Sequence, residues 1–141
     1  MATYEPVGVL KFKKLGPDMF IGQRYVDVDR QTGAASPGQI DQNDVLTAIP
    51  IRAGDVVIAA WVEVTTACTG GASADIGVGE KVDYWANGVA LDSTIIETNS
   101  SAATGGPHKF SVNDTVDLKV LEAGITAGVF RICALVVRSN N

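Results

Sequence analysis

The sequence has little charge, few aromatic side chains and no long hydrophobic run. Charged residues make up 19% of the 141 positions, below the roughly 25% of an ordinary soluble domain. The first sixteen residues, MATYEPVGVLKFKKLG, carry charges inside their apolar stretch. We therefore expect neither a signal peptide nor a membrane-spanning segment, and we expect synthesis in a cytoplasm.

Histidine and cysteine are too scarce for most catalytic or metal centres. His108 is the single histidine, and nothing around it resembles a Ser-His-Asp arrangement. Cys68 and Cys133 lie 65 positions apart and belong to no zinc-binding spacing. The pattern favours a buried free thiol at Cys133, and a Cys68–Cys133 disulfide is the alternative. We expect a protein that is not an enzyme and that has no cofactor or metal.

The acidic balance argues against a nucleic-acid partner. The net charge is −5 and the isoelectric point is about 4.7, whereas phosphate binding needs clustered Lys and Arg. Lys11, Lys13 and Lys14 are better interpreted as the solvent edge of a strand. Asp27 and Asp29 have the first spacings of a calcium loop, but Thr32 stands where that loop needs glycine.

Alternation of apolar and polar residues is the strongest pattern in the chain, and it predicts strands. Fifteen glycines supply turn material between them. The expected long strands are 7–13, 23–29, 55–67, 114–121 and 128–138, and shorter ones are expected at 45–49, 74–78, 94–97 and 108–112. The strand at 55–67 is long enough to need a bend or bulge, 128–138 is expected to be central and covered on both faces, and 86–92 is compatible with one helical turn.

These elements predict one all-β domain, a β-sandwich of about eight or nine strands with a jelly roll as the leading topology. Residues 1–24 are interpreted as an N-terminal strand or arm, and 25–141 as the sandwich. Two polar loops rich in glycine, serine and alanine, 31–43 and 98–107, separate strands and are alternatively binding loops.

Exposed aromatic residues are enriched at protein interfaces, so the aromatics give the candidate contact residues. Trp61 lies in the most apolar strand and is expected in the core or at its rim. The pair at 84–85 precedes Asn87-Gly88, and it is expected either near a loop or capping the core. The candidate interface residues are Tyr4, Phe12, Phe20, Tyr84 and Trp85.

Two segments resemble the small virion structural proteins of tailed bacteriophages. They are IPIRAGDVVIAAWVEVTTACTGGASADIGVG (49–79) and FSVNDTVDLKVLEAGITAGVFRICALVV (110–137). The likeness spans about residues 25–137 and includes the order of strands and glycine-rich turns. The chain is similar to head decoration, or cement, proteins. The resemblance implies a jelly-roll-like domain on the outer surface of the phage head, with the major capsid protein and copies of itself, as a homotrimer, for partners.

Two other functions remain open on the residues alone. A receptor- or glycan-binding appendage of the head or tail would use Tyr84, Trp85 and the two polar loops. A glycan hydrolase would need a close pair of carboxylates, whose proximity no single sequence reveals.

Overall fold

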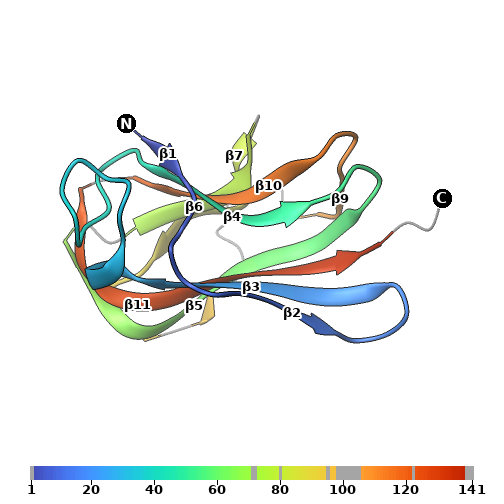
Figure 1. Ribbon diagram of the computed structural model, residues 1–141, viewed down its shortest axis with the longest axis horizontal. Coiled ribbons are helices and arrows are strands. Elements are labelled where there is room, and N and C mark those ends of the chain that lie inside the picture. Colours follow the sequence, from blue (N-terminus) through green and yellow to red (C-terminus); the bar gives the residue numbers. More distant parts are fainter. Residues whose placement is uncertain are drawn as a thin grey trace.

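The computed structural model describes residues 2–70, 73–79, 81–94, 96–97, 106–121 and 123–138, with only the backbone at 96–97. It is a sandwich of two β-sheets, as predicted (Figure 1). The described strands are β1 (Thr3–Tyr4), β2 (Leu10–Lys14), β3 (Met19–Asp27), β4 (Val45–Ile51), β5 (Val56–Gly70), β6 (Ser73–Val78), β7 (Lys81–Ala90), β8 (Ile96–Glu97), β9 (His108–Lys109), β10 (Asp114–Val120) and β11 (Ile125–Val137).

The predicted jelly roll is confirmed by the strand order. Sheet A runs β1-β4-β10-β6-β7, and sheet B runs β2-β3-β11-β5-β8 with β9 also paired to β5. The antiparallel pairs are nested around the β6–β7 hairpin: β5 with β8 and β9, then β4 with β10, then β3 with β11. One long ribbon is thus wound so that successive nested pairs lie in opposite sheets. Strands β1 and β2 extend this jelly roll at one side.

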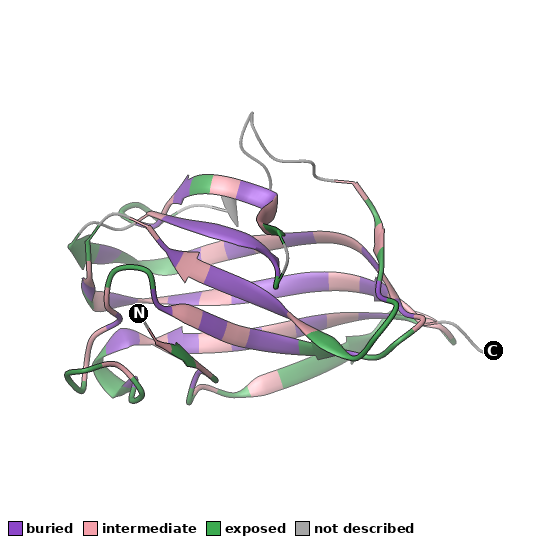
Figure 2. Cartoon of the chain, turned by 90° about the horizontal axis from the view of Figure 1, so that it is seen from above, coloured by how far each residue is buried: buried purple, intermediate pink, exposed green. Residues whose placement is uncertain are grey.

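The core lies between the sheets, and buried residues alternate with more exposed ones along the strands (Figure 2). Strand β11 lies between β3 and β5 and sends Phe130, Ile132, Ala134 and Val136 inward, all with no exposed surface. Facing them, sheet A contributes Leu46, Ile49, Ile76, Trp85, Val116 and Leu118, which are equally buried. The prediction of a central β11 is confirmed.

A bulge in β5 changes which residues face the core. Ala59 is opposite Leu135 and Val57 is opposite Val136, so Ile58 is an extra residue without a partner in β11. Ala60, Val62 and Val64 therefore point inward, but Val57 rather than Ile58 continues the buried row. The expected bulge is present, and it ends the simple alternation predicted for this strand.

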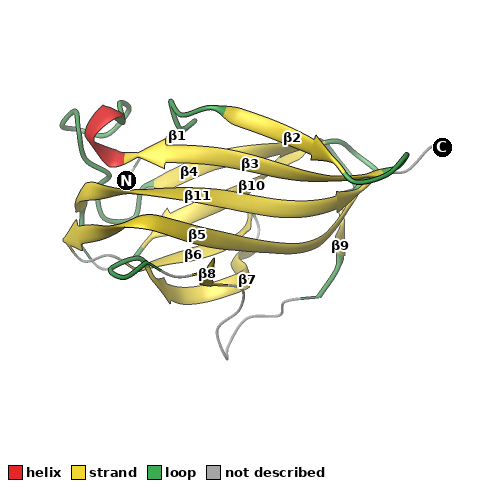
Figure 3. Cartoon of the chain, turned by 90° about the horizontal axis from the view of Figure 1, so that it is seen from below, coloured by secondary structure: helices red, strands yellow, loops and turns green. Residues whose placement is uncertain are grey.

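Three sequence expectations need correction. Residues 86–90 continue β7 instead of forming a helical turn, because they pair with β6. The strand expected at 23–29 ends at Asp27, and Val28–Arg30 form a 3-10 turn, η1, drawn in red in Figure 3. The outer face of β11 lies at the surface, since the described residues form only two layers. The favoured free thiol at Cys133, by contrast, is confirmed, and Cys68 is also free.

Within the described residues, no helix is long and apolar enough to cross a membrane. Most of the predicted polar loop 98–107 lies outside the described residues. The first 24 residues form β1, β2 and part of β3, and they pair into both sheets.

Gly77 offers a test of the close packing between β6 and β7. A Cβ built there would lie 2.1 Å from the backbone oxygen of Lys81, so Gly77→Ala must displace the β6–β7 hairpin. We expect a loss of about 1–3 kcal/mol in the free energy of unfolding, measured by urea titration. Gly16→Ala is the control, because a Cβ there meets nothing within 4 Å. Equal stabilities for the two variants would contradict the prediction.

Candidate functional site

His108, the single histidine, packs among aromatic rings on sheet A's side of the molecule. Its ring centroid lies 5.0 Å from those of Tyr84 and Phe110, each in an edge-to-face arrangement, and 6.2 Å from Trp85. Contacts of this kind stabilise a cluster of rings. The cluster of rings around His108 therefore covers the core beside β9.

Tyr84 and Trp85 belong to the same cluster but have different exposures. The Trp85 side chain has no exposed surface, and its Nε1 donates to the backbone oxygen of Gly106 at 3.1 Å. Tyr84 is half-buried, and its hydroxyl donates to the backbone oxygen of Pro107 at 3.2 Å. The pair thus anchors the chain before β9, and Trp85 presents no ring face to a ligand in the single chain.

The two cysteines are buried and held as neutral thiols. Burial raises the pKa of Cys68 to about 11. Burial also raises the pKa of Cys133, and the hydrogen bond from its thiol to Glu63 Oε2, at 3.3 Å, raises it further. Because the thiolate is the nucleophile, neither side chain is prepared for covalent chemistry.

A polar network covers part of the outer face of sheet B. Glu63 accepts from Arg131 Nε at 3.0 Å and from Trp61 Nε1 at 3.0 Å, and Arg131 also donates to the Tyr25 hydroxyl at 3.1 Å. Burial alone would raise the pKa of Glu63, but its hydrogen bonds from Arg131, Trp61 and Cys133 outweigh burial and lower it. This network satisfies its own charges. It holds Trp61 half-buried on the outer face of sheet B, opposite Cys133 of β11, and not in the core or at the rim as expected.

No acidic cluster suited to a metal occurs among the described residues. Asp27 instead caps η1: its Oδ1 accepts from the backbone N–H of Asp29 at 3.2 Å, and its carboxylate pairs with Arg30 at 3.7 Å. The calcium-like spacing noted in the sequence is therefore a 3-10 turn with a capping aspartate.

The N-terminal segment is fastened by two buried polar side chains, Asp44 and Arg24. Asp44 accepts from the Ala2 backbone N–H at 2.8 Å and from the Tyr4 hydroxyl at 2.7 Å, which together with burial raises the pKa of Tyr4. Arg24 donates to the backbone oxygens of Pro6 and Gly8, at 3.3 and 3.0 Å, and pairs with Glu5. These hydrogen bonds hold the segment together with the burial of Pro6 and the packing of Tyr4 against the core.

Exposed apolar side chains gather in the N-terminal part of the chain. Among described residues, the exposed large hydrophobic side chains are Val7, Val9, Phe12, Leu15, Met19 and Val112. Five of these six lie within residues 7–19, a segment with three lysines and one aspartate. This apolar and basic segment contrasts with the net charge of −5 of the whole chain.

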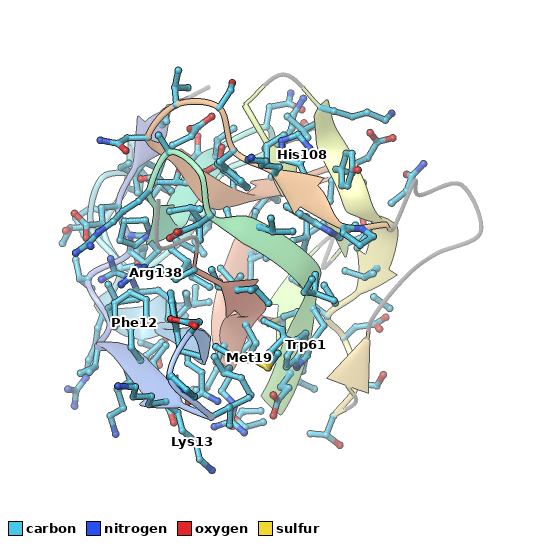
Figure 4. The ribbon with its side chains drawn as sticks, turned by 90° about the vertical axis from the view of Figure 1, so that its right-hand side faces the viewer. Phe12, Lys13, Met19, Trp61, His108 and Arg138 are labelled. Carbon is cyan, nitrogen blue, oxygen red and sulfur yellow. The ribbon has the colours of Figure 1, made fainter. Side chains whose placement is uncertain are left out.

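A surface at the β2–β3 turn, which we term the hairpin surface, is formed by Phe12, Leu15 and Met19 with Lys13 and Lys14. Figure 4 labels Phe12, Lys13 and Met19. Phe12 is 50% exposed, Leu15 48% and Met19 39%. An apolar surface rimmed by charged side chains is typical of a protein contact.

The hairpin surface borders a pocket of about 460 Å³ at the same end of the sandwich. Phe12 and Phe20 stack edge to face, with ring centroids 5.2 Å apart, and both line the pocket. Gly22 leaves room for Phe12, since a Cβ there would lie 3.2 Å from its ring. The Arg138 guanidinium lies 4.7 Å from the Phe20 ring centroid and donates to Asp55 Oδ2 at 3.2 Å.

The five predicted interface residues thus fall into three places. The fold brings Phe12 and Phe20 together at the pocket, and it brings Tyr84 and Trp85 together beside His108. Tyr4 lies apart, against Asp44. Sequence reasoning missed Arg138, Arg52 and Met19, and only the low charge of the chain signalled that apolar surface would remain exposed.

Comparison with known proteins gives one informative likeness. No protein-family model and no curated protein sequence matches the chain. A chain of the structure described as "Acidic stable capsid structure of Helicobacter pylori bacteriophage KHP30" matches with a TM-score of 0.57 and 13% identity. The match covers 90% of this chain and 93% of that chain. The two chains share a fold. The predicted resemblance to a phage virion protein is confirmed at that level.

Asp44→Ala tests the fastening of the N-terminal segment. The change leaves the Ala2 and Asp41 backbone N–H groups and the Tyr4 hydroxyl without their acceptor. We expect a loss of about 2–3 kcal/mol in unfolding free energy and faster hydrogen exchange at the Val45 amide, which donates to the Ala2 oxygen. Asp92→Ala, at an exposed site, is the control. Unchanged exchange at Val45 would contradict the role of Asp44.

Asp117 on the outer face of sheet A predicts a pH dependence. Burial raises its pKa to about 6, the Thr115 hydroxyl opposes that rise with a hydrogen bond of 2.5 Å, and Asp114 adds to it. The unfolded chain loses this proton near the ordinary aspartate pKa of 3.8, so the folded state binds more protons between these two pKa values.

Stability should therefore fall as pH rises from about 4 to 6, by roughly 2–3 kcal/mol, and the contribution of Asp117 should be constant above that range. In Asp117→Asn this slope should be lost, because the amide oxygen still accepts from Thr115 without ionising. Urea titrations from pH 4 to 8 measure the difference. A wild-type slope that persists in Asp117→Asn would rule out Asp117 as its source.

Proposed function

We propose that this chain is a non-enzymatic structural protein of a bacteriophage virion. It binds the outer surface of the assembled head as a decoration, or cement, protein. Its partners are the major capsid protein and copies of itself, arranged as a homotrimer. Its place of action is the virion.

The observation that carries this proposal is the shared fold with a chain of a phage capsid structure. The match extends over 90% of this chain and 93% of the other. The whole domain, not one motif, is therefore the shared unit. The sequence resemblance to head decoration proteins supports the same function independently of the coordinates.

The surface supports a role in binding protein. The hairpin surface exposes three large apolar side chains beside lysines, and Arg138 and Phe20 lie directly behind it. The described residues hold no metal-binding cluster, and the cysteine thiols are neutral. This end of the molecule can therefore bind a protein partner through apolar contact area and charge.

A protein of this kind can stabilise a shell by mass action. Binding the closed shell more tightly than its ruptured form lowers the free energy of the closed form. A trimer would add avidity, because each subunit engages while its neighbours are already bound. A rigid jelly roll suits this task, since little conformational entropy is lost on docking.

The receptor-binding alternative has no specific observation in its favour. It depended on Tyr84 and Trp85 as an exposed aromatic pair and on the two polar loops. The Trp85 side chain is buried, and most of the loop 98–107 lies outside the described residues. We therefore do not advance it.

Co-sedimentation with expanded head shells tests the proposal. The wild-type protein, first checked by light scattering for a mass of three times 14.7 kDa, should sediment with the shells. The double variant Leu15→Glu, Met19→Glu should bind about tenfold more weakly, since it places charge in the hairpin surface. Val112→Glu, at a side chain 63% exposed and outside that surface, should bind normally. Wild-type protein that stays in the supernatant would refute the proposal.

A further inference from the structure

The pocket beside the hairpin surface has an apolar floor and a charged rim. Phe12, Phe20, Pro50 and Ile51 form the floor, and Arg52, Asn113, Asp114 and Arg138 complete the lining. A second hollow of about 350 Å³ adjoins it, shares Phe12, Phe20 and Arg138, and adds Lys14. The two hollows thus share three lining residues, and each is of a size that accepts a large side chain.

The rim is held in place before any ligand arrives. Asn113 Oδ1 accepts from the Ala53 backbone N–H at 2.8 Å, which ties the β4–β5 turn to the turn before β10. The backbone N–H of Arg138 donates to the Asp18 oxygen at 2.7 Å, which ties the end of β11 to the β2–β3 turn. These bonds join three separate turns around the pocket, so its shape is preorganised.

The lining carries charges of both signs, the carboxylates of Asp114 and Asp18 and the cations of Arg52, Arg138 and Lys14. Arg138 is engaged by Asp55 and by the Phe20 ring. The exposed side chains of Arg52 and Lys14 make no hydrogen bond or ion pair with the described residues. Asp114 already accepts from the Thr115 backbone N–H at 2.8 Å. An incoming carboxylate would therefore find two uncommitted cations.

We propose that this pocket binds a segment of a partner protein in which a large apolar side chain is flanked by carboxylates. The apolar side chain would lie on the Phe12 and Phe20 rings, and the carboxylates would pair with Arg52 and Lys14. This inference rests on the proposed function in one respect: it takes the shell protein as the source of that segment.

A second copy of this chain does not supply such a segment among its described residues. The basic segment 7–19 contains the exposed apolar side chains of Val7, Val9, Leu15 and Met19. Glu5, which precedes this segment, is already paired with Arg24. Val112 precedes Asn113 and Asp114, which line the pocket itself. The chemistry of the pocket therefore favours a different protein as the occupant.

A peptide titration tests the pocket without any shell. The probe is acetyl-Glu-Phe-Asp amide, followed by amide chemical shifts in nitrogen-15 labelled protein. We expect shifts at Phe12, Ile51, Arg52 and Arg138. Peptides with Gln and Asn in place of the acids, or with Ala in place of Phe, should bind more weakly. Shifts elsewhere, no shifts, or equal binding of the three peptides would overturn the inference.

Two variants and two matched controls complete the test. Arg52→Glu should weaken binding of the probe by about fivefold, and Phe12→Ser should weaken it to a similar extent. Arg30→Glu makes the same charge change at the 3-10 turn η1, where its side chain is 83% exposed, and Val9→Ser removes an exposed apolar side chain outside the pocket. Both controls should bind normally. Arg52→Lys, which keeps the charge, should bind the probe nearly as well as the wild type, so the test of the charge does not depend on whether Phe12→Ser folds.

The shell assay separates this inference from the proposed function. Probe binding without shell binding would refute the proposed function and leave the pocket assignment standing. Shell binding with no effect of Arg52→Glu, and no probe binding, would refute the pocket assignment alone. A change of solution mass in Arg52→Glu would identify a second copy as the occupant and overturn the inference.

Discussion

The pairing of β11 with both β3 and β5 is the interaction on which the rest of the structure depends. It joins the last strand of the chain to an early one and to the longest one, and it closes the nested ribbon into a sandwich. Because the strands are antiparallel, the end of β11 meets the beginning of β3 and of β5. Val137 is opposite both Met19 and Val56, and this register delivers Arg138 to Phe20 and Asp55. The pocket is thus a consequence of strand register.

Buried polar groups decide how the N-terminal segment lies on this sandwich. An Arg24 or Asp44 without partners would cost several kcal/mol, so each organises backbone groups around itself. The chain from Ala2 to Gly8 is fixed by those hydrogen bonds, and Tyr4 also packs against the core. Val7 and Val9 accordingly stay exposed, and the path delivers β2 to the edge of sheet B with Phe12 beside Gly22.

Alternation in the sequence was sufficient to predict the sandwich, the central position of β11 and the bulge in β5, since burial on one face leaves a period of two. It failed where backbone irregularity intervenes. Trp85 and Ala86 are consecutive and both buried, because the register between β6 and β7 shifts near Ile76. The pocket could not be predicted. Its lining comes from four separate parts of the chain, and only Phe12 and Phe20 were suspected, as aromatics near lysines or prolines.

The location of the candidate site follows from which polar groups remain unsatisfied. On the outer face of sheet B, Glu63, Arg131, Trp61 and Cys133 satisfy one another. On the outer face of sheet A, Asp117 and Asp75 are bound by Thr115 and by the Gly88 backbone N–H. At the end that holds the hairpin surface, apolar rings are half exposed and two cations have no partner among the described residues. Binding a partner there costs little polar desolvation within the protein and covers apolar surface, so this end gains most from a contact.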